Sequence, residues 1–337
     1  MMQPSIASAY AELHCVSNFS FLKGASHPEE LVKQARTLGY QSIAITDECS
    51  VAGVVRAHTA AQAENIKLLI GSEFKLEEGT RFVLIAKNRC GYGYICDLIS
   101  AARRRAPKGT YRLSQKHFTE VENNCIAIWI PGTEVDTEVD TKHLYWLKDR
   151  FQSKVWIGVA RSMTNSETTK IEMLKYMSQL TMTSLVAIGN VHMHIRERRA
   201  LRDTIHAIRL KKTIKSSGFD LPPNGENYLR SINMIQNLYT LPLIAETLKI
   251  ANQCDFTLSS LKYEYPEEIT PNGISATQYL RTLVLKGLNW RFPKTVPEKV
   301  VQLIERELKI INELSYEPYF LTVFDITDYA RSQNILF

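Results

Sequence analysis

Apolar and polar positions alternate in two different ways along roughly the first two hundred residues of the chain. Short apolar runs rich in β-branched residues are followed by longer stretches in which apolar residues recur with the helical period. This pattern is typical of β-α units arranged around a parallel sheet, so we expect an α/β fold. Seven runs qualify as strands, which suits a barrel better than an open sheet: Ala11–Val16, Ser42–Ile45, Lys67–Ile70, Phe82–Ala86, Ile126–Ile130, Val155–Val159 and Leu185–Ile188.

Helices are expected between several of these strands, at Pro28–Leu38, Val51–Ala63 and Tyr92–Arg105. Ser26 provides a capping-type start for the first of them, and Gly39 is a stop signal just after it. The third ends in a run of arginines, which suits a helix C-terminus that faces water. The acidic near-repeat Thr133–Thr141 is expected to be a solvated loop.

The composition changes after Leu210, where proline, glycine and serine indicate a linker or an extended loop. Ser231–Cys254 is predicted to be helical, with a break at Asn237–Tyr239. After a second loop, Tyr263–Gly273, we expect helices near Thr277–Trp290 and Pro297–Leu314 and then an amphipathic stretch that stops on apolar residues. The pattern predicts three regions, 1–210, 211–273 and 274–337, the last of them interrupted rather than complete.

Composition and charge narrow the class of protein. The chain of 337 residues is 45% hydrophobic and 23% charged, as soluble globular proteins are. Its formal charge of +6 is a mild bias toward polyanions. Its 6 cysteines are scattered, without the paired spacing of a disulfide framework or a zinc ribbon. The sequence has neither a signal peptide nor an apolar run long enough to span a membrane, so we expect a cytoplasmic protein with no membrane partner.

Imidazole and carboxylate side chains fall at the carboxyl ends of predicted strands: His14 after the first, Asp47 and Glu48 after the second, Glu73 after the third, and His192 and His194 after the last. In an α/β barrel these ends converge on one face, so residues far apart in sequence can build one site. Phosphoesterases with two or three metal ions use this mixture of ligands to activate water and neutralise phosphate. From spacing alone, a metal site and a polar network at the rim are the two open interpretations.

Seven stretches, taken in order, closely resemble the amino-terminal part of bacterial C-family DNA polymerases: LHCVSNFSFLKGAS, AITDECSVAGVVRAH, IGSEF, KNRCGYGYICDLISAARRRAPKGTYRLS, IGNVHMHIRERRALRDTIHAIRL, YEYPEEI and ELSYEPYFLTVFDITDYARS. That family includes the polymerase III α-subunit, and the similarity is greatest to its error-prone, damage-tolerant branch. The resemblance runs through essentially the whole chain. It implies a PHP domain, a distorted seven-stranded TIM-like barrel, followed by a mostly helical segment that begins the polymerase palm and thumb.

The same resemblance implies that the first metal-binding motif is altered. Metal-binding PHP domains have His-x-His followed by an acidic residue before a glycine, whereas this chain has His14 and Val16 and then Lys23–Gly24. Valine has no lone pair to give a metal. The Lys23 ammonium would repel cations, since like charges about 4 Å apart cost on the order of 4 kcal/mol near a protein surface. We therefore interpret Val16 as apolar filler at the rim of the barrel.

The other motifs are changed in part. Asp47–Glu48 stands where the family usually has Asp-His, and Asn190 replaces an aspartate two residues before His192. The remaining candidate metal ligands are His14, Asp47, Glu48, Glu73 and His192, which could hold one weak ion at most. We expect no occupied cluster of metals and no cofactor in this chain, and Mg²⁺ only in the complete parent polymerase.

Further polar and aromatic residues have two interpretations each. His58 and His194 are either outer partners of a metal or hydrogen-bonded surface histidines, and we favour the second. Several basic residues could contact a phosphate backbone: Arg103–Arg105, Lys211–Lys212, Arg196, Arg198, Arg199 and Arg202. The last four follow a helical period poorly, and for these we favour a solvated face. The stripe Tyr316, Tyr319, Phe320, Phe324 and Tyr329 is expected to belong to a core rather than to a platform for bases.

The paired carboxylates of a polymerase, which hold two metal ions, are not recognisable in the sequence. The leading hypothesis is therefore the amino-terminal part of an error-prone DNA polymerase, inactive alone, whose barrel supports the rest of the polymerase core. Its partners would be that core, primer–template DNA and other damage-tolerance or replisome proteins. The alternatives are a free-standing PHP metal-dependent phosphoesterase and a non-catalytic module that binds DNA or a partner.

Overall fold

The computed structural model describes residues 9–118, 122–261, 270–271 and 273–336. The chain divides into two compact units, Met1–Ser260 and Leu261–Phe337, and each is described by itself. The first unit holds every strand in the described part of the chain together with the candidate site residues.

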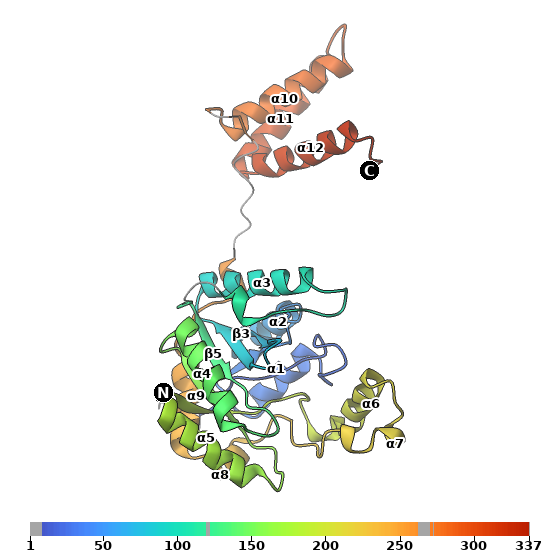
Figure 1. Ribbon diagram of the computed structural model, residues 1–337. Coiled ribbons are helices and arrows are strands. Elements are labelled where there is room, and N and C mark those ends of the chain that lie inside the picture. The colour runs from blue at the N-terminus through green and yellow to red at the C-terminus, as the bar shows by residue number, and fades with distance from the viewer. Residues whose placement is uncertain (1–8, 119–121, 262–269, 272, 337) are drawn as a thin grey trace. The chain divides into compact units, whose positions relative to one another are not determined.

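A sheet of seven strands, hydrogen-bonded in chain order, forms the centre of the first unit (Figure 1). Its strands are β1 (Ala11–Glu12), β2 (Ser42–Ile45), β3 (Lys67–Lys75), β4 (Arg81–Ala86), β5 (Cys125–Trp129), β6 (Val155–Ala160) and β7 (Ser184–Ile188). The chain after β1 meets the chain after β7, because the Val16 amide donates to the Val191 carbonyl at 2.8 Å and the Val191 amide donates to the His14 carbonyl at 2.9 Å. The two edges of the sheet are thereby joined, which confirms the predicted distorted barrel.

The expectation of an all-parallel sheet is wrong at one strand. β4 is antiparallel to both β3 and β5, while the other pairs are parallel. A parallel connection needs a crossover of a dozen or more residues, but only a tight turn separates β3 from β4. In that turn the Leu76 amide donates to the Thr80 carbonyl at 2.8 Å, and Gly79 has a φ of 95° that favours glycine. β3 and β4 therefore form a hairpin.

Helices surround the strands (Figure 1). In the first unit they are α1 (Pro28–Thr37), α2 (Val54–Glu64), α3 (Arg89–Arg104), α4 (Thr137–Phe151), α5 (Glu167–Thr181), α6 (Arg199–Arg209), α7 (Ile214–Ser217), α8 (Ile232–Leu238) and α9 (Leu241–Ala251). The loop predicted at 133–141 is wrong in its second half, because Asp136 caps α4. Its carboxylate accepts hydrogen bonds from the amides of Glu138 and Val139 at 3.0 and 3.1 Å.

Alternating side chains of the strands divide between two cores. On β4, Val83 and Ile85 pack in one cluster with Leu69 of β3 and with residues of α9. Phe82 and Leu84 point the other way, into a larger cluster that includes the inner faces of the surrounding helices. Side chains along a strand alternate with a period of two, so Glu73 of β3 shares the face of Leu69 and stands above the first of these cores.

The second unit consists of α10 (Ala276–Arg291), α11 (Glu298–Glu313) and α12 (Glu317–Ser332) in its described part. The aromatic stripe that we expected to belong to a core is not covered within the described part of this unit: Tyr319, Phe324 and Tyr329 are 46%, 39% and 65% exposed. The buried side of α12 carries Leu321 instead, because α12 packs against α10. No helix in the parts of either unit that the structure describes has the length and apolar character needed to cross a membrane.

Candidate functional site

His14 and Glu73 lie in direct contact at the rim of the barrel. The Nε2 atom of His14 is 2.7 Å from Oε2 of Glu73, and the two side chains are 0% and 3% exposed. Burial lowers the pKa of His14 despite the neighbouring carboxylate, so the imidazole is neutral near pH 7. A carboxylate can only accept hydrogen bonds, so Nε2 of His14 carries the ring proton and has no lone pair for a metal. The lone pair of the neutral ring lies on Nδ1, which is buried without a hydrogen-bond partner in the described structure.

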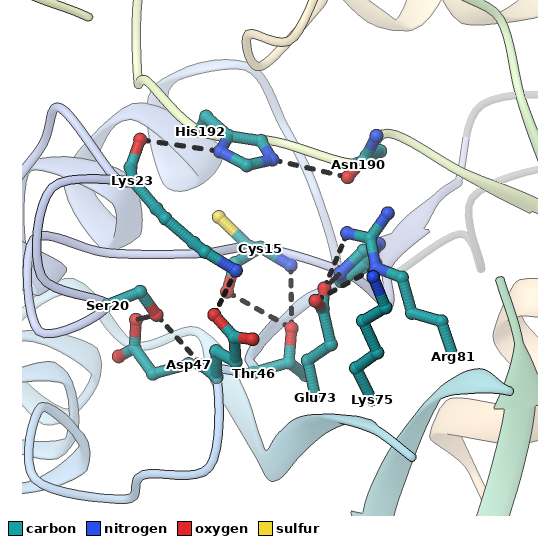
Figure 2. Close-up of polar contacts among 12 residues, drawn as sticks. Cys15, Ser20, Lys23, Thr46, Asp47, Glu73, Lys75, Arg81, Asn190 and His192 are labelled. Carbon is teal, nitrogen blue, oxygen red and sulfur yellow. Dashed lines mark hydrogen bonds and ion pairs between the residues drawn. The ribbon is translucent and has the colours of Figure 1, made fainter. Parts of the chain in front are cut away.

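Arg81 of β4 holds both oxygens of Glu73. Its Nε donates to Oε1 at 2.9 Å and its terminal nitrogen donates to Oε2 at 2.7 Å (Figure 2). Burial alone would raise the pKa of the Glu73 carboxyl, but the Arg81 guanidinium and the His14 hydrogen bond hold it well below its usual range. The carboxylate is therefore ionised and already neutralised by a cation that belongs to the protein.

Asp47 follows β2 and is saturated by serine donors. Its Oδ1 accepts from the Ser17 amide at 2.8 Å and the Ser20 hydroxyl at 2.7 Å, and its Oδ2 accepts from the Ser17 hydroxyl at 2.7 Å. Burial raises the pKa of the Asp47 carboxyl, and these hydrogen bonds oppose that effect. Asp47 is 1% exposed, so its lone pairs serve to fix the loop that follows β1.

Glu48 and Lys23 form an ion pair across the same rim. The other oxygen of Glu48 accepts a hydrogen bond from the Tyr111 hydroxyl at 3.0 Å. The resemblance led us to expect Lys23 to repel a metal, and the contact with Glu48 gives its ammonium a further consequence. The Lys23 ammonium neutralises the negative charge of Glu48, which is then not available to bind a metal ion.

His192 and Asn190 complete the rim after β7. The Nε2 of His192 is 3.3 Å from Oδ1 of Asn190, and Nδ1 is 3.5 Å from the Lys23 carbonyl. Burial lowers the pKa of His192 well below its ordinary value, and the cations Arg202 and Arg81 lower it further. Val16, where the resemblance implies a second histidine, is 1% exposed and lines a cavity at the rim together with Glu73 and His192.

The residues present do not fit a cluster of metal ions. Glu73, Asp47 and Glu48 each have both oxygens in contact with protein donors, and two of these carboxylates have a cation among their donors. Among the residues that the structure describes, no three His, Cys, Asp or Glu side chains are placed so that they could hold an ion. The rim is a polar network in which Arg81 and Lys23 supply the positive charge.

Arg81 was not among the predicted site residues, and the prediction that Arg202 lies on a solvated face is wrong. The signal for Arg81 was the hairpin turn at Gly79, because an antiparallel register sets Arg81 diagonally across from Glu73 on one face. Arg202, grouped above with a solvated face, is only 8% exposed and lines a cavity of about 360 Å³ beside Glu73. Its burial follows from α6, a helix that we did not predict.

Two histidines and one arginine from the remaining candidates have structural contacts. His194 Nδ1 is 2.8 Å from the Ser26 hydroxyl and His58 Nε2 is 3.1 Å from the Ser259 hydroxyl, in line with the interpretation as hydrogen-bonded histidines. Arg103 donates to the Cys49 carbonyl at 3.1 Å and lies over the Tyr111 ring. The Arg103 guanidinium therefore ties α3 to the loop after β2 instead of facing solvent.

Two regions of the chain match models of known protein families, and the whole chain matches part of longer proteins. Residues 12–141 match the family model described as PHP domain, and residues 278–337 match the one described as bacterial DNA polymerase III alpha NTPase domain. An error-prone DNA polymerase of Methylococcus capsulatus is 45% identical over 336 residues, which is 99% of this chain and 32% of that protein. Over nearly its whole length, the chain is similar to a part of the error-prone DNA polymerases.

Another such relative, the error-prone DNA polymerase of Pseudomonas aeruginosa, is 44% identical over 98% of this chain and 31% of its own length. The chain thus spans about a third of the length of these curated relatives. Among solved structures, a metal-dependent phosphoesterase described as putative, from Bifidobacterium adolescentis, aligns with 57% of this chain and 89% of its own, with a TM-score of 0.39 and 14% identity. The predicted resemblance to error-prone polymerases, with an amino-terminal PHP domain, is confirmed.

Proposed function

We propose that this chain is part of an error-prone DNA polymerase and that its PHP barrel is a structural domain without hydrolytic activity. The polymerase then adds nucleotides during damage-tolerant synthesis, and the barrel supports its core. The chain by itself does not transfer nucleotides, because no pair of carboxylates suited to two metal ions is recognisable in its sequence.

The contact between Arg81 and Glu73 is the observation that carries this proposal. PHP-type hydrolysis needs metal ions that activate water and neutralise a phosphate, and such ions need carboxylates with free lone pairs. Here the guanidinium takes both oxygens of the Glu73 carboxylate, and that residue is 3% exposed. A metal ion would have to compete for Glu73 with a guanidinium that already neutralises its charge through two hydrogen bonds.

The alternative of a free-standing phosphoesterase makes a different prediction about the same atoms. It requires Glu73 to leave Arg81 and to bind a cation, and His14 could contribute only through Nδ1, which has no hydrogen-bond partner in the described structure. The proton on the His14 nitrogen and the two Arg81 hydrogen bonds oppose that rearrangement. We therefore favour the structural role.

A hydrolysis assay separates the two functions. The purified chain is incubated with p-nitrophenyl phosphate, and separately with single-stranded DNA, in the presence of Mn²⁺ or Zn²⁺. The proposal predicts no release above the blank and no difference between the chain and its Glu73→Gln variant. Metal-dependent release that disappears in Glu73→Gln would establish the phosphoesterase instead. A primer-extension assay with Mg²⁺ is expected to show no added nucleotide.

A further inference from the structure

The cavity beside Glu73 is lined mainly by positively charged side chains. Its lining combines five cations (Lys23, Lys75, Arg81, Arg202 and Arg209) with two carboxylates (Glu48 and Glu73). Its volume is about 360 Å³, which is ample for a small anion with some of its water. The remaining lining includes the neutral side chains Val16 and Asn190.

Both carboxylates of the cavity are already paired. Lys23 contacts Glu48, and Arg81 holds Glu73 through two hydrogen bonds. Three cations of the lining therefore remain without a carboxylate of their own in the described part of the chain. They are Lys75, Arg202 and Arg209.

Lys75 stands directly opposite Arg81 across the β3–β4 hairpin. Directly opposed residues of an antiparallel pair have their Cβ atoms about 5 Å apart, and like charges in this arrangement destabilise a sheet. Figure 2 shows the two side chains next to each other beside Glu73. An additional anion would relieve the repulsion between Lys75 and Arg81.

Arg202 reaches the cavity from α6 and is only 8% exposed. Its guanidinium makes one long contact, 3.5 Å from a terminal nitrogen to the Asn224 carbonyl. Burial lowers the pKa of Arg202 to about 10 although the nearby Asp203 carboxylate opposes this effect, so the cation is held largely out of water. Arg209 lies about two helical turns further along α6 and contacts only the His206 ring, at 3.5 Å, in the described structure. A buried guanidinium aimed into a cavity is well suited to bind an oxyanion through paired N–H donors.

We propose that this cavity binds a phosphate group through Lys75, Arg81, Arg202 and Arg209, with the cations of the protein in place of metal ions. The inference rests on the proposed function, because it requires the cavity to be free of metal. A phosphate monoester carries close to two negative charges at neutral pH, which matches a lining with three unpaired cations better than a backbone phosphodiester does. The phosphate is either free inorganic phosphate or the terminal phosphate of a nucleic acid.

Binding is measured on the full chain in EDTA, so that metal ions take no part. Isothermal titration calorimetry compares three ligands: inorganic phosphate, a short single-stranded DNA with a 5′-phosphate, and the same DNA without it. Saturable binding of inorganic phosphate supports the cavity as a phosphate site. Binding of the phosphorylated DNA at least tenfold tighter than the unphosphorylated DNA identifies a nucleic-acid end as its source, and equal binding of the two identifies free phosphate.

Lys75→Gln/Arg202→Gln removes one lysine and one arginine from the cavity, and we expect it to weaken phosphate binding about tenfold or more. The matched control, Lys33→Gln/Arg36→Gln, removes the same two charges from the exposed face of α1 and should leave affinity within about twofold. Lys75 is exposed, so Lys75→Gln alone tests the site even where loss of Arg202 harms folding. It should weaken binding about threefold with an unchanged Tm.

Three outcomes overturn the inference, and only the last also contradicts the proposed function. No saturable binding in EDTA, or equal losses in the cavity and control variants, would show that the cavity is not a phosphate site while the metal-free barrel stands. Binding that appears only after Mn²⁺ is added would contradict both, because a metal and not the protein cations would then hold the phosphate.

Discussion

The guanidinium of Arg81 and the carboxylate of Glu73 lie on one face of the β3–β4 hairpin and share two hydrogen bonds of 2.9 and 2.7 Å. The hairpin register places the two residues diagonally, so the backbone itself fixes this contact. Because Glu73 also touches His14, one ion pair links β3, β4 and the segment after β1. The positive charge at the rim of the barrel is therefore built into the sheet.

Replacing Arg81 should reveal how much this ion pair stabilises the barrel. Arg81→Gln leaves Glu73 buried without a cation, and we expect a loss on the order of 3 kcal/mol in the free energy of unfolding. Urea denaturation at pH 7 measures it. The matched control is Arg56→Gln, whose exposed pair with Glu29 should contribute about 1 kcal/mol or less. Equal effects of the two variants would contradict a special role for Arg81.

The effect of Arg81→Gln should depend on pH in a defined direction. In the native chain the pKa of Glu73 lies well below 4.5, so its contribution is complete above pH 4.5 and is lost as the pH falls through the folded value. Without Arg81, burial should raise that pKa instead, and protonation of Glu73 would then relieve the buried charge. The cost of the substitution should shrink from pH 7 toward pH 4. A cost that stays constant over this range would show that Glu73 is not the group responsible.

Ser20 should stabilise the loop after β1 through its hydroxyl. This group donates to Asp47 at 2.7 Å and accepts from the Glu48 amide at 2.8 Å, so Ser20→Ala leaves two buried polar groups short of a partner. We expect a loss of about 1–3 kcal/mol by urea denaturation. Thr59→Ala removes an exposed hydroxyl on α2 that bonds to the Val55 carbonyl and should change stability by about 0.5 kcal/mol or less. A small effect at Ser20 would mean that water replaces the hydroxyl.

Gly24 is required by a close approach of two backbone segments. A Cβ at this position would lie 2.1 Å from the Ser17 carbonyl oxygen, so Gly24→Ala must displace the loop, at a cost of about 2–4 kcal/mol. Gly93 in α3 has nothing within 4 Å of such a Cβ, and Gly93→Ala should instead stabilise the chain by about 0.5–1 kcal/mol. Thermal denaturation of both variants checks the opposite signs. A neutral Gly24→Ala would show that the loop can move freely.

Strand positions were predictable where apolar runs were continuous and less so where they were interrupted. The run Lys67–Ile70 predicts the start of β3 but stops five residues early, because Ser72, Glu73 and Lys75 are polar although the backbone continues to pair with β4. The first strand was predicted through Val16, but β1 ends at Glu12 and the chain beyond it pairs near Val191. Polar residues on a paired strand hide its length from pattern analysis.

The helix α4 was missed for a related reason. The near-repeat of acidic residues looked like a solvated loop, yet Asp136 is a favourable N-cap and Glu138 and Asp140 suit the first turn of a helix. The predicted start of α2 at Val51 was also early, since α2 begins at Val54. The stretch before α4 contains a capping signal at Asp136, but its acidic, repetitive composition led us to predict a loop.

The candidate site was predictable in its members but not in its contacts. The strand-end rule identified His14, Glu73 and Asp47, and all three lie buried at the rim. It said nothing of Arg81 or Arg202, because a residue that enters from a hairpin register or from a separate helix leaves no mark at a strand end. Which cation neutralises which carboxylate depends on pairings between distant segments, and one sequence does not contain them.

Metal binding tests the central claim most directly, namely that Arg81 and Lys23 have taken the place of metal ions at the barrel rim. Isothermal titration calorimetry with Mn²⁺ and with Zn²⁺, supported by elemental analysis of the dialysed protein, gives the number of ions bound per chain. The account predicts no stoichiometric binding for the native chain or for Glu73→Gln. Two or more tightly bound ions that are lost in Glu73→Gln would contradict it.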